Sequence, residues 1–314
     1  MKRLLFGISV LICLALIAVY IFIPAEIKLS KSIFIKTQAP AASRFLLDKR
    51  QWAKWFPSDA VTPDATSVNT ILRSDNFSYT VGNALMNTTQ VLISDNKRSI
   101  NSLINTLSIN KDSAAVEWKA EIKTSMNPIG RIRSYNDAKE IESDMNKILI
   151  SLQAFLEKQQ NVYGLKIVEQ QVTDTILIST KYFSSSTPST IEIYSLLNNL
   201  QKYISKEGGK ETNPPMLNIA KDGNTYRTMV AIPVDKTIPE KDNYVFKRMV
   251  PGRILVAEVR GGEYRIQQAF KQLGLYVDDN HLSSPAIPFA SLITNRQAEP
   301  DTTKWITKIY YPIY

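Results

Sequence analysis

The chain has 314 residues, 44% of them hydrophobic and 21% charged, which is typical of a folded protein with room for two domains. Lys and Arg exceed Asp and Glu by 38 to 29, a net charge of +9, and the chain has one Cys and one His. A disulfide or a Cys/His zinc site is therefore excluded, and a triad mechanism would have to run through His281. The composition favours binding over catalysis.

The first segment is strongly apolar. From Leu4 to Ile23 there is no charged residue, and the length of about 30 Å matches a hydrocarbon core. A cleaved signal peptide is the alternative, but its apolar region spans only about 7–15 residues, and Pro24 follows instead of a cleavage motif. The sequence predicts an uncleaved transmembrane anchor within residues 1–25.

The flanking charges predict the orientation of this anchor. Lys2 and Arg3 favour a cytoplasmic N-terminus, so residues 24–314 are expected outside the cytoplasm of a single-pass membrane protein. Basic residues also follow the anchor, and we interpret them as the solvated face of a strand: Lys28, Lys31 and Lys36. Elsewhere Lys and Arg are scattered, which disfavours nucleic-acid binding and allows weak attraction to anionic lipid headgroups.

Residues 26–163 are expected to form the first domain. Alternation over residues 27–35 predicts a strand, a short helix follows Pro40, and Asp48 is expected to cap a second short helix. Further strands are predicted at five places: 67–72, 77–81, 89–94, 102–109 and 114–125. A long helix is then predicted over about 138–160, where apolar residues recur on one face. An antiparallel sheet around a long helix can enclose an apolar cavity.

Two local motifs in this region resemble a known family. They are Trp52-Ala53-Lys54-Trp55-Phe56-Pro57 after the first strand, and Asn127-Pro128-Ile129-Gly130-Arg131 before the long helix. Both resemble the START-like (SRPBCC, polyketide-cyclase-type) helix-grip family over about residues 26–160. The resemblance implies a cavity for hydrophobic ligands, and only some members of that family are enzymes.

Residues 164–314 contain an internal repeat. The segment 228–234 recurs 79 residues later as 307–313, and in each copy Pro ends the strand. A strand and a helix precede each copy, at 172–180 and 190–206 in the first half and at 254–260 and about 263–273 in the second. The sequence therefore predicts a duplicated β-α-β-β domain with a central cleft, and an α+β chain overall.

This layout resembles the gyrase-inhibitor-like domain, the effector-binding module of AraC-type and MerR-type regulators. The residues that carry the resemblance are Ala231-Ile232-Pro233-Val234, Gly262-x-Tyr264 and the closing strand 307–313. The family implies binding of small flat or cationic hydrophobic molecules, and a few members are thought to be hydrolases.

One departure from that family bears on chemistry. After Pro288-Phe289, the positions where cation-binding or hydrolytic members have Glu and Tyr are Ala290 and Leu292. A buried carboxylate offsets the desolvation of a bound cation and can serve as a general base. Its loss makes both roles less favoured.

Aromatic residues are the remaining candidates for ligand contacts. We expect five of them to face the second cleft: Tyr226, Tyr264, Phe289, Trp305 and Tyr310. Packing within the sheet is the alternative for each, because aromatic residues are common in strands. In the first domain, Trp52 and Trp55 either close the cavity mouth or hold the short helices on the sheet.

These observations lead to three hypotheses about function. The leading one is a membrane-anchored, non-enzymatic binding protein for small hydrophobic ligands, with no metal or cofactor. The second is a hydrolase or cyclase that uses Glu258 or Glu263 with a Tyr, although Glu263 at a helix start is explained by the helix dipole alone. The third is an envelope interaction protein. His281 lies in a polar stretch and is expected in a surface loop.

Overall fold

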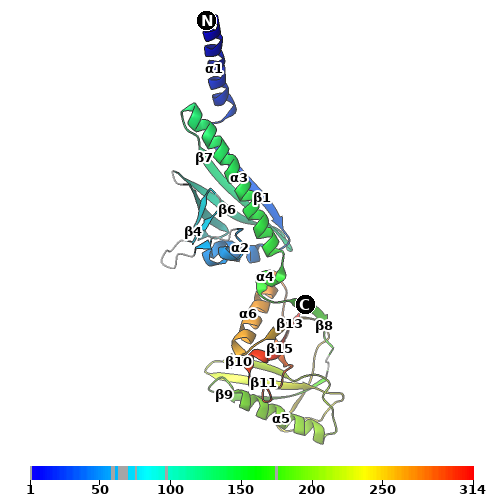
Figure 1. Ribbon diagram of the computed structural model, residues 1–314. Helices are drawn as coiled ribbons and strands as arrows, with labels where there is room; N and C mark the ends of the chain where they lie inside the picture. The colour runs from blue at the N-terminus through cyan, green and yellow to red at the C-terminus, as the bar shows by residue number, and fades with distance from the viewer. Residues whose placement is uncertain (1, 58–60, 63–69, 75, 96–97, 174–175) are drawn as a thin grey trace. The chain divides into compact units, whose positions relative to one another are not determined.

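A computed structural model describes residues 2–57, 61–62, 70–74, 76–95, 98–173 and 176–314. The chain forms two compact units, residues 1–158 and 159–314, each described by itself below. The sequence interpretation placed the boundary a few residues later, after residue 163. Mixed α+β structure with curled antiparallel sheets is found, as the sequence predicted (Figure 1).

The first unit begins with helix α1 (Lys2–Phe22). Its end is held by two contacts: the Tyr20 hydroxyl donates to the Met126 carbonyl (2.6 Å), and the Arg131 Nε donates to the Ile23 carbonyl (2.7 Å). The Arg131 guanidinium also lies 4.8 Å from the centre of the Tyr20 ring. Within the part of the chain that the structure describes, no helix combines the length and apolar character needed to cross a membrane, so the anchor predicted at residues 4–23 is not supported.

The sheet of the first unit has the strand order β1-β7-β6-β5-β4-β3-β2, with every neighbouring pair antiparallel. The bounds are β1 (Glu26–Ile35), β2 (Val61–Thr62), β3 (Thr70–Arg73), β4 (Ser78–Leu85), β5 (Thr88–Ser94), β6 (Ser99–Asn110) and β7 (Ser113–Lys123). Apart from β2, for which no strand was predicted, these strands occupy the predicted regions. Residues 67–69 of one predicted strand lie outside the described residues.

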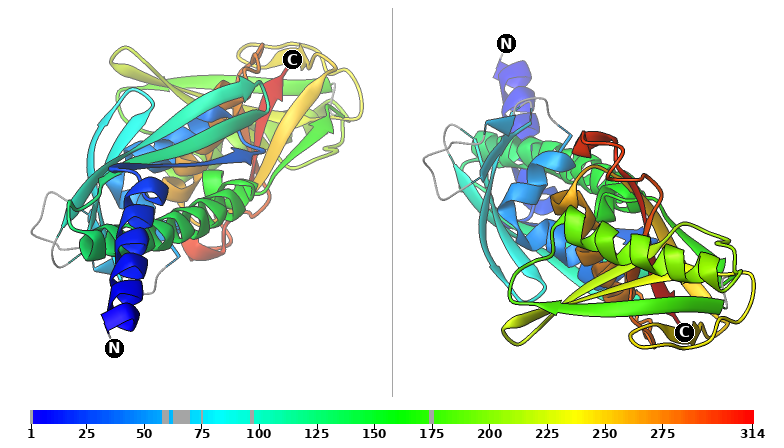
Figure 2. Two further views of the ribbon diagram at one scale, coloured as in Figure 1. Left: turned by 90° about the horizontal axis from the view of Figure 1, so that it is seen from above. Right: turned by 90° about the horizontal axis from the view of Figure 1, so that it is seen from below.

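Helix α3 (Pro128–Leu156) packs along β1 and β7 (Figures 1 and 2). It starts about ten residues before the predicted start at 138. Pro128 occupies the first turn and the Asn127 side chain accepts a hydrogen bond from the Gly130 N–H, which together form a helix start. These residues were expected to precede the helix, as part of the family motif, rather than to form its first turn.

The short helices confirm the predicted cap. Helix α2 (Ala39–Leu47) is followed by the 3-10 helix η1 (Lys49–Lys54), and the Asp48 side chain accepts from the Arg50 N–H between them. Asp48 also binds the Arg50 guanidinium through both carboxylate oxygens. These hydrogen bonds keep the pKa of the Asp48 carboxyl below its usual value, although partial burial opposes the shift.

An aromatic chain fills the centre of the first unit. Trp52 contacts Trp55, Phe56 contacts Tyr79, and Tyr79 contacts Trp118, with ring centres 4.6 to 5.8 Å apart. The Tyr79 hydroxyl donates to the buried Asp144 carboxylate on α3 at 3.1 Å. This hydrogen bond ties the sheet to the long helix.

The second unit contains the predicted repeat. Its first half is β9 (Ile176–Ser184), α5 (Thr190–Lys206), β10 (Met216–Asp222) and β11 (Thr225–Pro233). The second half is β13 (Arg253–Arg260), α6 (Glu263–Asp279), β14 (Phe289–Leu292) and β15 (Ile306–Ile313). The remaining elements are α4 (Gln159–Tyr163), β8 (Ile167–Gln171), β12 (Val245–Arg248) and η2 (Thr302–Lys304).

The sheet order shows how the two halves join. It runs β12-β9-β11-β10-β14-β15-β13-β8, so that the mirrored sets β9-β11-β10 and β14-β15-β13 meet between β10 and β14. There Met216 pairs with Ser291 and Leu217 with Ala290. Helix α5 has the predicted bounds and lies along β9 and β11 (Figure 2).

The two faces of this sheet bury different clusters. Alternate residues such as Val230 and Ile232 pack with Leu197 and Leu200 of α5. Their neighbours on the opposite face, including Ala231, form a second cluster with Leu177, Met216, Ile254, Val256 and Phe289. Each face of the sheet therefore has its own apolar surface.

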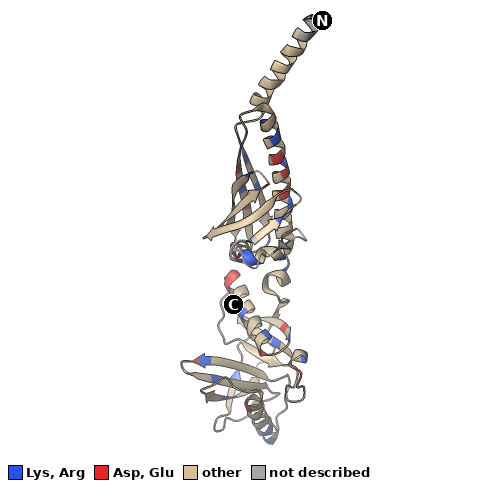
Figure 3. Cartoon of the chain, turned by 60° about the vertical axis from the view of Figure 1, so that its left-hand side comes forward, with Lys and Arg blue, Asp and Glu red and all other residues tan. Residues whose placement is uncertain are grey.

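Charged side chains of both signs are interspersed along the chain (Figure 3). Helix α3, for example, carries Arg133 and Lys139 beside Asp137 and Glu140. The expectation that nucleic acid is not a partner stays a prediction.

Candidate functional site

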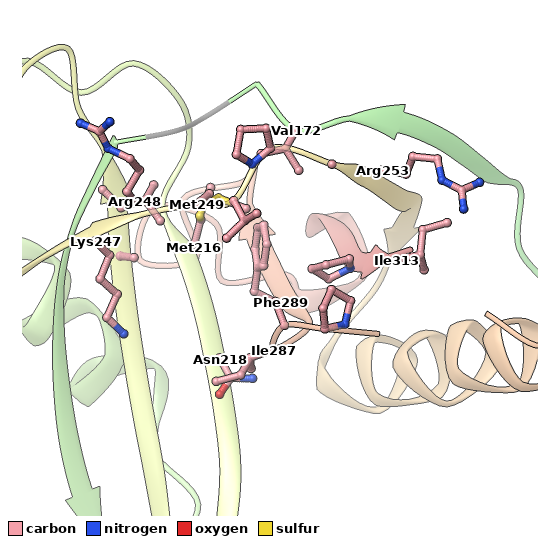
Figure 4. Close-up of a pocket in the computed structure, with 18 of the residues that line it drawn as sticks. Val172, Met216, Asn218, Lys247, Arg248, Met249, Arg253, Ile287, Phe289 and Ile313 are labelled. Carbon is pink, nitrogen blue, oxygen red and sulfur yellow. The ribbon is translucent and has the colours of Figure 1, made fainter. Parts of the chain in front are cut away.

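The main candidate site is a cavity of about 300 Å³ on the face of the second sheet that is opposite α5. Strands β9, β10, β11 and β14 supply one wall, through residues including Leu177, Met216, Ala231 and Phe289. Two loops complete it, residues 249–252 between β12 and β13 and residues 285–287 before β14. Figure 4 shows Phe289 between the methionines Met216 and Met249 and the strand end at Ile313.

The walls of this cavity are apolar and adaptable. Three methionines, Met216, Met229 and Met249, line it together with three prolines. Methionine has a flexible, polarisable side chain that adjusts to irregular shapes. Phe289 is fixed instead, because its ring stacks on Tyr310 with centres 5.0 Å apart and planes 7° apart. The cavity thus combines one rigid aromatic surface with deformable walls.

The charged side chains among the described lining residues of this cavity are all positive. Its lining residues include Lys247, Arg248 and Arg253 but no Asp or Glu among those described. Arg253 is paired with Glu169 of β8 at 3.3 Å, whereas Lys247 and Arg248 extend on the other side in Figure 4. Such a lining offers no opposite charge to offset the desolvation of a bound cation.

Asn218 is the polar side chain at the junction of β10 and β14. Its Nδ2 donates to the Pro288 carbonyl at 2.9 Å, while its Oδ1 is buried and has no hydrogen-bond partner among the residues that the structure describes. A buried acceptor without a partner is costly, and a donor on a ligand or a water molecule can satisfy it. Asn218 is therefore the group in the cavity best placed to accept a hydrogen bond.

The predicted aromatic residues of the second unit lie in different places. Phe289 lines the cavity and Tyr310 stacks behind it. Tyr264 is 76% exposed and, with buried Trp305, lines a separate cavity around the start of α6. Tyr226 is partly buried on β11, where the Lys221 ammonium lies 6.0 Å from its ring centre. The structure does not bring all five rings to one cleft.

Trp52 and Trp55 are buried in the first unit. The Trp52 indole donates to the Leu46 carbonyl at 2.9 Å, which joins η1 to α2. The two rings pack against each other, with centres 4.6 Å apart. The hydrophobic cavity expected in this unit stays a prediction.

The predicted titratable candidates lie outside the 300 Å³ cavity. Glu258 is exposed on β13 and lies 3.6 Å from the Arg260 guanidinium. Glu263 starts α6, and His281 is exposed in the turn that follows that helix. Over the described ranges, no group of three His, Cys, Asp or Glu residues could hold a metal ion.

The sequence interpretation missed most of the residues that form the cavity. The two loops, 249–252 with Met249 and 285–287, lie in segments with no repeating pattern. The available signal was the alternation of strands β10 and β11, which places Met216, Met229 and Ala231 on one face of the sheet.

No protein-family model matches the sequence, and no curated protein matches it. Solved structures are similar in fold. The C-terminal domain of EcmrR is 17% identical over 48% of this chain and 98% of its own, with a TM-score of 0.41. SAV2435 bound to tetraphenylphosphonium is 14% identical over 48% of this chain and 94% of its own, with a TM-score of 0.32.

A START superfamily protein from Mycobacterium smegmatis is 13% identical over 40% of this chain and 97% of its own, with a TM-score of 0.29. The structural neighbours thus include both a START superfamily protein and effector-binding-type domains. At these identities the similarity concerns the fold and assigns no ligand to this chain.

Proposed function

We propose that this chain is a non-enzymatic binding protein for small hydrophobic molecules, and that the 300 Å³ cavity of the second unit holds the ligand. The observation that carries the proposal is the lining: methionine, proline and aromatic side chains around a space at the lower end of the range for ligand pockets. Asn218 offers one buried acceptor that can orient a ligand.

The charges refine the ligand class. Because the described lining has basic but no acidic side chains, a hydrophobic cation would lose its hydration without gaining an ion-pair partner. A neutral or anionic apolar molecule meets no such cost, and Lys247 or Arg248 can contact a negative group at the rim. We therefore propose neutral and anionic hydrophobic ligands in preference to cationic ones.

The absence of an acid in this lining also supports binding without turnover. General acid–base catalysis needs a group that exchanges protons near the working pH and reaches the substrate. The carboxylates considered from the sequence, Glu258 and Glu263, do not line this cavity. We propose that the ligand is released unchanged.

A matched set of probes tests this proposal. Thermal shift and calorimetry on the full chain should show stabilisation by 2-naphthoate and 2-naphthalenemethanol, and little by the cation 2-naphthylmethylammonium. Ala231→Leu places three more carbon atoms in the cavity and should weaken binding of the first two probes at least tenfold. Ala298→Leu makes the same change at an exposed site and should leave affinity unchanged.

Two results would reject the proposal. One is a cation that binds as tightly as its neutral analogue. The other is an Ala231→Leu protein that folds normally and still binds the naphthalene probes at full strength.

We also propose that residues 4–23 attach the chain to a membrane, with residues 24–314 outside the cytoplasm. Support comes from the charge-free sequence after Lys2 and Arg3, and from exposed apolar side chains such as Phe6 and Leu11 on α1. The full chain should resist carbonate extraction from membranes, and a C-terminal reporter should be active only when it functions outside the cytoplasm. Complete release by carbonate, or a reporter active in the cytoplasm, would reject this part.

A further inference from the structure

A second candidate site lies on the helix side of the same sheet, around the side chain of Arg296. This side chain is only 4% exposed, yet it lines two cavities of about 240 and 540 Å³. Both cavities also have Ile219 and Glu263 in their walls. Arg296 therefore stands at the border between two spaces that can admit a small molecule.

The position of Arg296 is fixed by three contacts. Its backbone N–H donates to the Tyr194 hydroxyl at 2.7 Å, and its Nη2 donates to the Thr307 hydroxyl at 3.0 Å. The guanidinium lies over the Trp305 ring, 4.7 Å from its centre. These contacts hold the planar group in one orientation, so little freedom is lost when it binds a ligand.

The charge of this guanidinium is weakly compensated. In the described ranges its one hydrogen bond goes to the neutral Thr307 hydroxyl. Glu263 lies 4.0 Å away, beyond hydrogen-bond distance, and its side chain is 48% exposed and accepts from Gln267. Burial lowers the pKa of Arg296, although the nearby Glu263 opposes this, and arginine remains charged in proteins. A buried cation in such surroundings favours an additional anionic partner.

The walls suggest the shape of that partner. The larger cavity offers the Trp305 indole and the Ile193 and Ile219 side chains, together with the hydroxyls of Ser189 and Thr302. Its lining contains Arg265 and Arg296 against Glu263, so positive charge is in excess. A flat apolar body can lie against the indole while a carboxylate meets the guanidinium through two parallel hydrogen bonds.

We infer that Arg296 anchors a second binding site, which takes a small organic monocarboxylate with a flat apolar body. The site lies on the opposite face of the sheet from the cavity proposed above and does not depend on it. Glu263 opposes the anion at this site, which favours acids with a single negative charge over dicarboxylates.

Benzoate titrated into the full chain tests the inference, with benzyl alcohol as its neutral counterpart. Trp305 is the only tryptophan of the second unit, so a change in its fluorescence reports binding beside Arg296. Arg296→Lys keeps the charge but loses the forked geometry, and we expect at least a tenfold loss of benzoate affinity. Benzyl alcohol should bind far more weakly than benzoate to the unchanged chain.

A second variant keeps the test decisive if Arg296→Lys fails to fold. Glu263→Gln removes the opposing charge from an exposed helix start, and benzoate should then bind roughly three to ten times more tightly. Glu258→Gln removes a carboxylate that lines none of these cavities and should change nothing. A purely structural Arg296 predicts no such gain from Glu263→Gln.

The outcomes separate the two sites. Tighter binding in Glu263→Gln, with normal benzoate affinity in Ala231→Leu, supports the Arg296 site. Benzoate affinity that falls in Ala231→Leu and does not respond to Glu263→Gln places the acid in the other cavity and overturns the inference, as does the absence of benzoate binding.

Discussion

The hydrogen bond between Tyr79 and Asp144 allows a quantitative test of how the first unit is held together. Tyr79 is fully buried on β4, and its hydroxyl donates to the Asp144 Oδ2 at 3.1 Å. Burial, followed by the negative charge of Asp144, raises the pKa of Tyr79 well above its usual value. The mostly exposed Lys147 ammonium forms an ion pair with the Asp144 carboxylate, with a distance of 3.7 Å between Nζ and Oδ1.

Replacing Tyr79 by Phe should therefore leave a buried carboxylate short of a donor. A hydrogen bond to a charged group contributes about 1.5–3 kcal/mol, so Tyr79→Phe should lower the free energy of unfolding by that amount. In an Asp144→Asn background the acceptor is neutral, and the same change should cost only about 0.5–1.5 kcal/mol. The double-mutant cycle should give a coupling of about 1 kcal/mol.

Urea unfolding of the full chain followed by tryptophan fluorescence measures this, because three of the four tryptophans lie in the first unit: Trp52, Trp55 and Trp118. Equal costs of Tyr79→Phe in both backgrounds would refute the reasoning, since the hydroxyl would then not be stabilising the charge of Asp144. A cost below about 0.5 kcal/mol in the unchanged background would refute it as well.

Other changes have defined outcomes in the same unfolding assay. Ser189→Ala removes the side chain that caps α5 together with Glu192 and should cost about 0.5–2 kcal/mol; no change would mean that the cap is dispensable. The pKa of Asp48 is lowered in the folded state, so its carboxylate stabilises the fold at neutral pH, and this stabilisation should be lost as the pH falls below about 4. The Asp48→Asn protein should not show this loss of stability in acid. Phe289→Ala removes a stacked ring that borders the 300 Å³ cavity, so it should lower the free energy of unfolding by about 3 kcal/mol, the lower end of the range for such changes. The enlarged cavity should bind probes larger than the naphthalenes more tightly than the unchanged chain does. A loss near 5 kcal/mol would mean that the ring is packed as tightly as one in a filled core.

The regular elements were predictable because burial imposes a period on the sequence. Helix α5 has the predicted bounds, since its apolar residues recur on one face and Ser189 with Glu192 forms a capping box. The duplicated strands were found because Pro233 and Pro312 end equivalent segments. The start of α3 was missed because the buried residues among its first ten, Arg131 and Ser134, are polar, so there is no apolar stripe to detect.

The cavities were less predictable, because a cavity forms where side chains from distant segments leave space between them. Met249 and Ile287 come together from two loops without periodicity, and nothing in either segment alone predicts that meeting. Arg296 illustrates the same difficulty. Its environment comes from Tyr194, Thr307 and Trp305, and only the folded chain brings these residues together.

The joint between β10 and β14 has a mechanical consequence. The ladder between the two halves consists of two residue pairs, Met216 with Ser291 and Leu217 with Ala290, whereas β13 and β15 pair over their full eight-residue length. A force that pulls the two halves of the sheet apart is therefore borne by these few backbone hydrogen bonds. Leu217 and Asn218 line cavities on both faces of the sheet, so a ligand bound in either cavity contacts the strand at this same short joint.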